Sequence, residues 1–376
     1  HVSLGVRSDR SSTLGDTEKS HMYPKFAASY RTGQLAVFDD LKVRTSYGVT
    51  GNMPKPFAKY TAMSPSNIGG MSGLVTSGLK GLDDIAPEEM AELEYGVDGS
   101  IMNGLLGFEF TLYNQNITGL LLEVEEAPST GYTNKWANAG DMETKGMELD
   151  LVLNPVRTKD LNWVSRLSYY TTSSEITRLD VPAFPQPGAG FGLGLGTFYI
   201  QEGQPVTQLA GNIGGVPTQI GNVEPDFQVS FNNNFTISKN LEIGFLIHWK
   251  EGGENINLSK LLTDLGGVTA DLDTPEGQAR ASLGFVPQRF IEPAAYMRLR
   301  EAGIYYNLPK DTFSWLSEDI TNIKLGLTGR NLLTITDYSS YDPETSVNGG
   351  AGLSSGIEVT PYPNSKQYLF SLNVNF

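Results

Sequence analysis

DFQVSFNNNFTISKNLEIGFLIHWK, residues 226–250, contains the pattern that decides the fold. Apolar side chains fall on nearly every second position over 227–237 and again over 241–249, with polar side chains between them. This period of two is typical of a β-strand with one apolar and one polar face. Only residues 238–240 separate the two runs, so we predict an antiparallel hairpin. Its apolar face would hold Phe227, Phe231, Phe245, Ile247 and Trp249, and its polar face Asn232, Asn234, Glu242 and His248.

The same alternation recurs about a dozen times along the chain. Further runs lie at residues 41–49, 106–112, 146–153, 296–306, 322–330 and 368–376. In the run 296–306 the phase slips after Glu301, which a β-bulge would explain. The sequence therefore predicts an all-β fold of about twelve antiparallel strands.

Composition limits the class of protein. The 376 residues include 42 Gly, 17 Tyr and 17 Phe, a mixture that suits many strands joined by Gly-rich loops and is too aromatic for disorder. The formal net charge of −15 argues against a nucleic-acid partner, which would need a basic face. The absence of Cys excludes disulfides and Cys-ligated metals. No stretch approaches 18 consecutive apolar residues, so no transmembrane helix is predicted.

The connections between the predicted strands alternate in length. The longer ones include 50–86, 177–223, 251–294 and 333–366, and the shorter ones 33–39, 98–104, 155–160, 238–240 and 308–320. With strictly antiparallel strands, every longer connection falls on the same side of the sheet. This is the plan of an outer-membrane β-barrel, whose periplasmic turns are short and whose extracellular loops are long. A soluble sandwich has no reason to segregate its loops in this way, so we interpret residues 1–376 as part of one transmembrane barrel domain.

The last residues form a strand in which Tyr368, Phe370, Leu372, Val374 and Phe376 alternate with polar residues. We expect it to be the closing strand, antiparallel to 323–332, with Phe370, Leu372, Val374 and Phe376 outward toward lipid. Because lipid allows no open sheet edge, its other edge would pair with the first strand of the barrel. The run also resembles the C-terminal signal that the barrel-assembly machinery reads. The chain opens with alternation at residues 1–7, so we interpret it as a fragment.

Several strings together resemble the C-terminal half of SusC/RagA-type TonB-dependent transporters of Bacteroidota. They are LKVRTSYGVTGN (41–52), NAGDMETKGMELDL (138–151), IGNVEPDFQVSF (220–231), YMRLREAGIYYNLP (296–309), LGLTGRNLLTITDYSSYDPE (325–344) and the terminal strand. The resemblance spans nearly the whole chain, and the strings occur in the family's order.

The resemblance implies a 22-stranded barrel of which this chain would supply the last twelve strands. It also implies a signal peptide, a TonB-interacting segment and an N-terminal plug domain, all of which lie outside this sequence. A SusD-like surface lipoprotein would cap the extracellular loops. The function implied is TonB-dependent import of a glycan or peptide oligomer, driven by the proton gradient of the inner membrane. The alternatives are an adhesin or enzyme barrel, or a barrel fragment captured as a client of the assembly machinery.

No catalytic or metal-binding constellation is evident in the sequence. The three histidines, at positions 1, 21 and 248, lack the spacing of a zinc or nucleophilic site, and no cofactor is expected. The Gly-rich run 188–196 lacks the features of a phosphate loop and is interpreted as a flexible extracellular loop. The acidic run 271–277 lacks the ligand spacing of an EF-hand and is interpreted as a plain acidic loop.

Aromatic residues in the predicted extracellular loops are the candidates for substrate contact. They are Trp136, Phe184, Phe191, Phe198 and Tyr199. Aromatic rings in such loops can stack on sugars or peptides, but they can equally pack the loops against one another. The sequence does not separate these two interpretations.

Overall fold

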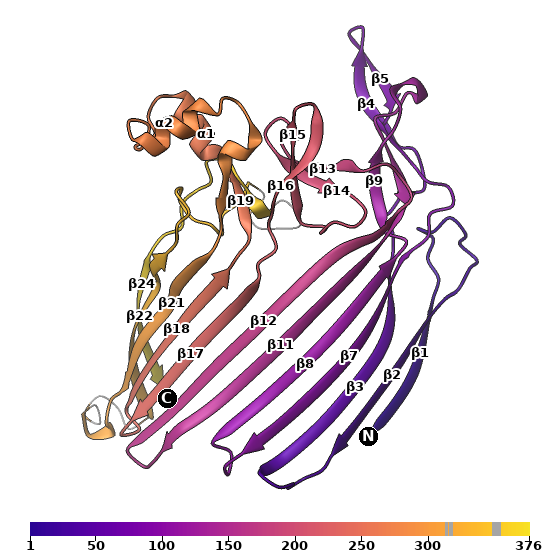
Figure 1. Cartoon of the computed structure of the whole chain (residues 1–376). Coiled ribbons are helices and arrows are strands. Elements are labelled where there is room, and N and C mark those ends of the chain that lie inside the picture. Colours follow the sequence, from indigo (N-terminus) through magenta and orange to yellow (C-terminus); the bar gives the residue numbers. More distant parts are fainter. Residues whose placement is uncertain (313–314, 316–318, 348–354) are drawn as a thin grey trace.

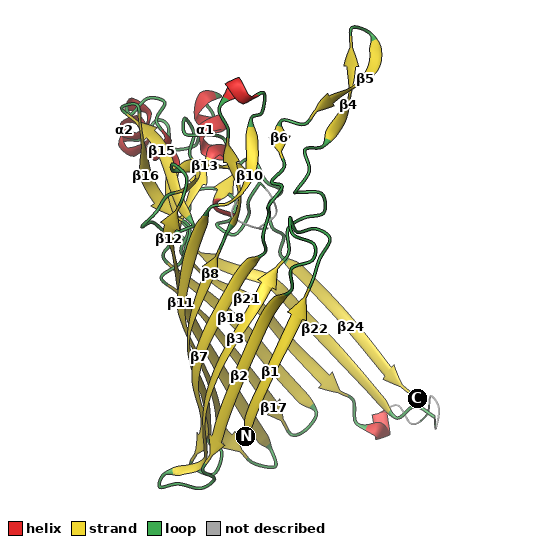
Figure 2. Ribbon diagram, turned by 90° about the vertical axis from the view of Figure 1, so that its right-hand side faces the viewer, coloured by secondary structure: helices red, strands yellow, loops and turns green. Residues whose placement is uncertain are grey.

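The computed structural model describes residues 1–312, 315, 319–347 and 355–376. Within these residues, twelve strands form one antiparallel sheet whose spatial order follows the chain (Figure 1). They are β1 (Val2–Asp9), β2 (His21–Arg31), β3 (Phe38–Asn52), β7 (Glu88–Ile101), β8 (Leu106–Thr118), β11 (Gly140–Arg157), β12 (Leu161–Leu179), β17 (Phe227–Ile237), β18 (Leu241–Glu251), β21 (Tyr296–Asn307), β22 (Asn322–Ile335) and β24 (Gln367–Asn375). The sheet is strongly curved, with β1 and β24 at its two edges (Figure 2). This up-and-down order confirms the predicted antiparallel barrel wall.

The hairpin β17–β18 has the predicted pairing. Phe231 lies opposite Ile247, and the ladder runs without a shift from one end of the hairpin to the other. Ser238 and Lys239 in the turn both have positive φ, 48° and 65°, as expected of a tight link between twisted strands. Ring contacts place Phe227 beside Trp249 and Phe231 beside Phe245 on the same face. The predicted register of the hairpin is therefore confirmed.

One polar row and one apolar row cross the sheet on opposite faces. The polar row runs Arg31, Lys42, Asp98, Glu109, Asp150, Ser168, Ser230, His248, Arg298. The apolar row, one position away, runs Leu41, Gly99, Phe108, Leu151, Leu167, Phe231, Ile247, Leu299, Leu333. A wall with these two faces suits a polar lumen on one side and lipid on the other.

Asn233 interrupts the apolar face of β17 and has a local partner. Its side chain is buried, and its Oδ1 accepts a hydrogen bond of 2.9 Å from the indole Nε1 of Trp163. This bond removes part of the penalty for placing an amide beside lipid.

The phase slip near Glu301 is a β-bulge, as predicted. Leu299 pairs with Ile247 and Glu301 with Leu246, so Arg300 has no partner across the ladder. Arg300 lies two residues after Arg298 and shares the polar face with it, where the Arg300 Nη2 and His248 Nδ1 are 2.8 Å apart. The extra residue also turns Glu301 to the polar face, where it lies opposite Leu246, whereas unbroken alternation would have turned it toward lipid.

Connections of very different length leave the two ends of the sheet (Figure 1). One end carries residues 10–20, 53–87, 119–139, 180–226, 252–295 and 336–366, and the other carries only 32–37, 102–105, 158–160, 238–240 and 308–321. Both chain ends lie at the end with the short connections (Figure 1). We refer to the long connections together as the loop cap.

The loop cap contains secondary structure that the sequence patterns did not predict. It holds the hairpin β4 (Met63–Ile68) and β5 (Met71–Thr76), the small sheet of β6 (Leu79–Lys80), β9 (Leu121–Glu125) and β10 (Asn134–Asn138), the sheet of β13 (Phe184–Gly190), β14 (Thr197–Ile200), β15 (Gln208–Ile213) and β16 (Val216–Asn222), the strands β19 (Glu254–Asn257), β20 (Ile291–Pro293) and β23 (Ile357–Glu358), and the helices α1 (Leu258–Leu265) and α2 (Pro275–Ser282). Short 3-10 turns lie at η1 (Pro128–Thr130), η2 (Pro287–Phe290) and, at the opposite end of the sheet, η3 (Lys310–Thr312). Neither helix is long enough, or apolar enough, to cross a membrane.

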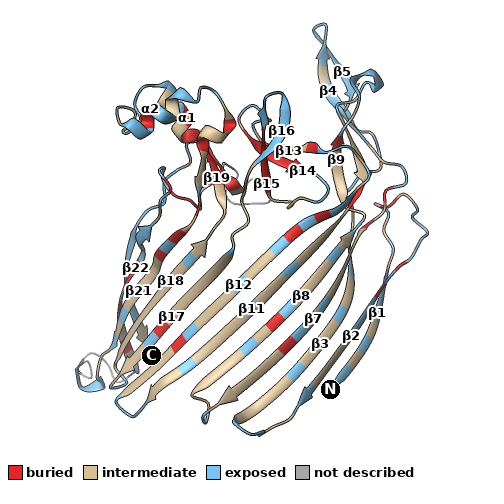
Figure 3. Cartoon of the chain, viewed as in Figure 1, coloured by how far each residue is buried: buried red, intermediate tan, exposed pale blue. Residues whose placement is uncertain are grey.

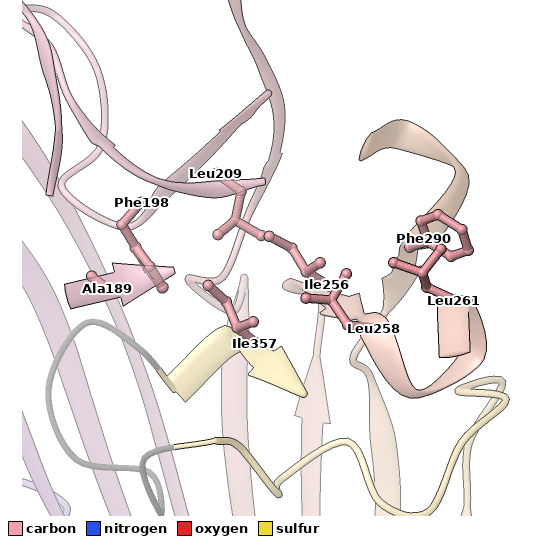
Figure 4. Packing of buried hydrophobic residues seen from close by; sticks show 8 residues of the cluster. All are labelled: Ala189, Phe198, Leu209, Ile256, Leu258, Leu261, Phe290 and Ile357. Atoms are coloured by element: carbon pink, nitrogen blue, oxygen red, sulfur yellow. The ribbon is translucent and has the colours of Figure 1, made fainter. Parts of the chain in front are cut away.

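The largest buried apolar cluster lies in the loop cap and not in the sheet (Figure 3). Its members are Ala189, Phe198, Leu209, Ile256, Leu258, Leu261, Phe290 and Ile357 (Figure 4). They come from three different long connections, which therefore share one core. The run 188–196, expected to be a flexible loop, contributes the end of β13 and the buried Ala189 to it.

Strand β24 pairs with β22 as predicted, from Gln367 opposite Arg330 to Asn375 opposite Asn322. Phe370 and Leu372 lie opposite Leu327 and Leu325, which continues the apolar face of the wall. Val374 lies opposite Ile323 and therefore shares this face as predicted, where it packs against Ile323; Tyr368 has the same phase, and Phe376 follows the last residue of the strand. Within the described residues, the outer edges of β1 and β24 have no strand partner.

Candidate functional site

Three of the five candidate aromatic residues are buried in the loop cap. Phe198 in β14 has no exposed surface and is part of the shared core (Figure 4). Phe184 in β13 belongs to a second core with Ile200. The hydroxyl of Tyr199 donates a 3.1 Å hydrogen bond to the carbonyl of Ala183. Their burial favours the packing interpretation that the sequence left open, because a buried ring offers no face to a ligand.

Trp136 and Phe191 keep accessible surface. Phe191, just after β13, is 47% exposed. Trp136, in β10, is half-buried, and the ammonium of Lys55 lies 5.7 Å from the centre of its ring. The five aromatics therefore do not converge on one surface, and any contact of these two with a substrate is a proposal.

A charged cluster that the sequence patterns did not single out lies where the loop cap meets the polar face of the wall. Arg298, in β21, is 1% exposed although it carries a full charge. Its guanidinium donates to Asp342 at 2.7 Å and to Glu344 at 2.5 Å. The Arg300 guanidinium donates to the same Glu344 carboxylate at 2.6 Å, and Tyr296 also donates to it. Buried charges are tolerated when they are paired and hydrogen-bonded in this way.

This cluster attaches the connection 336–366 to the wall. Asn364 donates to Asp342 at 2.6 Å, and Asn255 donates to the carbonyl of Pro343 at 2.8 Å. The run YDPE (341–344) therefore contacts β19 through Asn255 and β21 through Arg298. A signal existed in the sequence, because two arginines share the run 296–306 beside its phase slip, but no pattern indicated that Glu344 would be their partner.

A cavity of about 470 Å³ opens beside this cluster on the polar face, below the loop cap. Its lining comes from four strands of the wall and from the connections 180–226, 252–295 and 336–366. The charged lining groups are Glu224, Lys250 and Glu344. The cavity lies within the size range of small-molecule sites and has polar groups on several sides.

The acidic run 271–277 takes part in ion pairs. Asp271 lies 2.7 Å from Arg280, which also contacts Asp264 at 3.0 Å. Burial alone would raise the pKa of Asp264, but hydrogen bonds from Arg280, Thr269 and Arg289 outweigh it and lower the pKa to about 2. These groups stabilise the loop cap. In the described part of the chain, no group of three or more His, Asp or Glu side chains is placed to hold a metal ion.

Comparison with known proteins settles the family. The profile of the family described as "TonB dependent receptor-like, beta-barrel" matches residues 1–332. The chain belongs to this family. The two-faced wall is thus part of a TonB-dependent receptor barrel in the outer membrane, with the polar face toward the lumen and the apolar face toward lipid.

Relatives within the TonB-dependent receptors agree with the resemblance seen in the sequence. The chain is 28% identical to "TonB-dependent receptor P26" of Formosa agariphila over its whole length and 44% of the relative. It is 21% identical to "TonB-dependent receptor SusC" of Bacteroides thetaiotaomicron, over 99% of the chain and 42% of SusC. The structure of the "RagAB peptide transporter" superposes with a TM-score of 0.80 at 22% identity, over all of this chain and 45% of that one. The SusC/RagA type is confirmed, and the chain spans less than half the length of the relatives that it matches.

Proposed function

We propose that the chain forms the C-terminal part of the barrel of a SusC-like transporter, which imports a glycan or peptide oligomer across the outer membrane in a TonB-dependent step. The observation that carries the proposal is the wall itself, with a polar lumen face covered at one end by a structured loop cap. RagAB is described as a peptide importer and SusC as a TonB-dependent receptor, and both resemble this chain. Energy would reach the transporter through TonB acting on a plug domain.

The protein would perform no chemistry on its substrate. Its family consists of receptors for transport, and several charged groups of the described lumen face are held in ion pairs, among them Lys42 with Asp98 and Arg298 with Asp342 and Glu344. Substrate selection would then depend on binding alone. We place it at the loop-cap end, where Trp136 and Phe191 keep accessible surface.

A SusD-like surface lipoprotein would bind the loop cap from outside. In support, the hairpin β4–β5 extends from the cap and carries exposed apolar side chains, among them Met63, Met71 and Leu74 (Figure 1). Affinity purification of the full-length transporter from outer membranes should recover this lipoprotein. Removal of residues 63–76 should reduce the recovered amount, and a purification without any lipoprotein would contradict the partnership.

Uptake by whole cells tests the function directly. Cells with the full-length transporter should accumulate fluorescent oligosaccharides or oligopeptides of one class, and cells lacking either the transporter or TonB should not. Equal accumulation in the strain without TonB would reject TonB-dependent import. Accumulation of neither class by the intact strain would reject oligomer import.

Assembly by the barrel machinery would use the terminal strand, and we expect removal of Phe376 to lower the amount of folded barrel. Burying one Phe side chain contributes only about 1.5–3 kcal/mol, so a severe defect would come from lost recognition during insertion. The measurement is the heat-modifiable, folded fraction in outer membranes with and without Phe376. Normal folded protein with lost uptake would reject the assembly role.

A further inference from the structure

Lys250 differs from Lys42 and Lys324, two other lysines on the lumen face of the wall. Lys42 lies 2.9 Å from Asp98, and Lys324 lies 2.7 Å from Glu242. Lys250, near the loop-cap end of β18, lines the 470 Å³ cavity and is half-buried. Among residues 1–312, 315, 319–347 and 355–376, no carboxylate oxygen lies within 4 Å of its ammonium, and no side chain or carbonyl accepts a hydrogen bond from it.

The two carboxylates that share the cavity with Lys250 are bound to other donors. Glu344 accepts hydrogen bonds from Arg298, Arg300 and Tyr296. Glu224 accepts from the Ser174 hydroxyl at 2.8 Å, as well as from the Ser174 amide and the Thr207 hydroxyl. Neither carboxylate accepts a hydrogen bond from Lys250, so the ammonium, which belongs to a residue that lines the cavity, keeps donors that no described group uses. A partly desolvated charge without a partner is costly, which favours an acceptor that arrives from outside.

We propose that Lys250 binds a carboxylate of the imported oligomer, so that the transporter selects acidic glycans or peptides with a free carboxyl group. The proposal rests on the proposed import function and names the chemical class of its substrate. The cavity lies on the lumen face directly below the loop cap, where an entering oligomer arrives. Gln228 and Thr172 line the same cavity and offer hydrogen-bonding groups beside the ammonium. The volume suits one end of an oligomer, with the rest of the chain extending into the lumen.

Glu224 allows a test that distinguishes an anionic from a cationic ligand in this cavity. Its negative charge lies in the same cavity and opposes the binding of a carboxylate. If Lys250 holds an anionic group, Glu224→Gln should tighten binding of that group. If the cavity instead holds a cationic group at Glu224, the same substitution should weaken binding of that ligand, and this result would overturn the proposal.

Binding to the purified full-length transporter tests it with two matched pairs of fluorescent probes. One pair is tetragalacturonate and its methyl ester, and the other is tetra-alanine with a free or an amidated C-terminus. The wild type should prefer the carboxylated member of one pair, which also tells whether the carboxylate comes from a glycan or a peptide. Lys250→Gln should lower the affinity for that probe about tenfold or more, as expected for a lost charge-assisted hydrogen bond. Its affinity for the neutral probe should equal that of the wild type. Lys250→Arg should retain most of the affinity.

Lys42→Gln is the matched control, because Lys42 also faces the lumen but already has Asp98 as its partner. It should leave both pairs unaffected, and the heat-modifiable band should be the same for all variants. The proposal is overturned if the wild type shows no preference within either pair or if Lys250→Gln binds the carboxylated probe like the wild type. It is also overturned if Lys42→Gln loses as much affinity for that probe as Lys250→Gln does. Because TonB-dependent uptake is measured separately, a transporter that imports oligomers without this preference would refute the carboxylate site and leave the import function standing.

Discussion

The barrel wall and the loop cap place the same kinds of residue in opposite positions. In the wall, Phe370 is 73% exposed while Arg298 is 1% exposed. In the loop cap, Phe198 has no exposed surface and its neighbours form an ordinary apolar core. In the wall, apolar side chains face outward to lipid and polar side chains face inward. In the loop cap, apolar side chains are buried, as in a protein surrounded by water.

The two regions are consequently stabilised in different ways. The wall depends on its ladder of backbone hydrogen bonds, because backbone groups in lipid have no other partner. The loop cap depends on buried apolar side chains and on paired charges such as Asp264 with Arg280 and Arg289. Substitutions of the same chemical kind should therefore have different effects in the two regions.

The largest difference should follow from removing an aromatic ring. Phe198→Ala leaves a cavity in the core shared by three connections and should destabilise the loop cap by about 3–5 kcal/mol. Phe370→Ala removes a ring that faces lipid, and lipid can fill the space, so its effect should be much smaller. Hydrogen exchange of the amides in β14, β19 and α1 should accelerate strongly in the first variant only. Equal acceleration in the two variants would contradict the claim that the wall and the loop cap are stabilised in different ways.

Adding a charge should distinguish the two faces of a single strand. Phe231→Lys places an ammonium toward lipid near the middle of β17 and should cost about 2–4 kcal/mol. Asn232→Lys, one residue away, places the same group in the lumen and should cost little. Urea unfolding of the full-length transporter in liposomes measures both. A larger loss for Asn232→Lys would show that the faces are assigned the wrong way round.

The smallest expected effect is the acid sensitivity of the loop cap. The pKa of Asp264 in the folded protein, about 2, lies below its ordinary value of 3.8, so its ionised form stabilises the fold. That contribution, about 2 kcal/mol, is complete above pH 4 and is lost as the pH falls from about 4 to about 2. Hydrogen exchange near α1, corrected for intrinsic rates, should rise across this range, and Asp264→Asn should remove the pH dependence. An unchanged pH profile in Asp264→Asn would exclude this carboxylate as the cause.

The strands were predictable because their information is local. A period of two over residues 227–237 and 241–249 fixes which side chains share a face, and three linking residues fix the pairing of the two strands. The slip after Glu301 likewise identified a bulge, since a single extra residue shifts the pattern visibly. Each of these predictions needed only the residue pattern within one strand and the length of the link to the next strand.

The loop cap was not predictable in the same way, because its contacts join segments that are distant in the chain. Phe198 and Ile357 share one core although they belong to different connections. Nothing in the run 188–199 distinguishes a ring that binds a ligand from one that packs against another loop. The pairing of Arg298 with Glu344 and the unpaired ammonium of Lys250 depend on the same long-range arrangement.

The central claim is that the wall has a lumen face and a lipid face with the phase described for β17. Residues 1–376 contain no Cys, so single cysteines at positions 229, 230, 231, 232, 234 and 235 can carry a spin label without background from this part of the barrel. In liposomes, collision with oxygen, which concentrates in lipid, should be high at 229, 231 and 235. Collision with a water-soluble nickel chelate should be high at 230, 232 and 234. The reverse phase, or accessibility without alternation, would contradict the account.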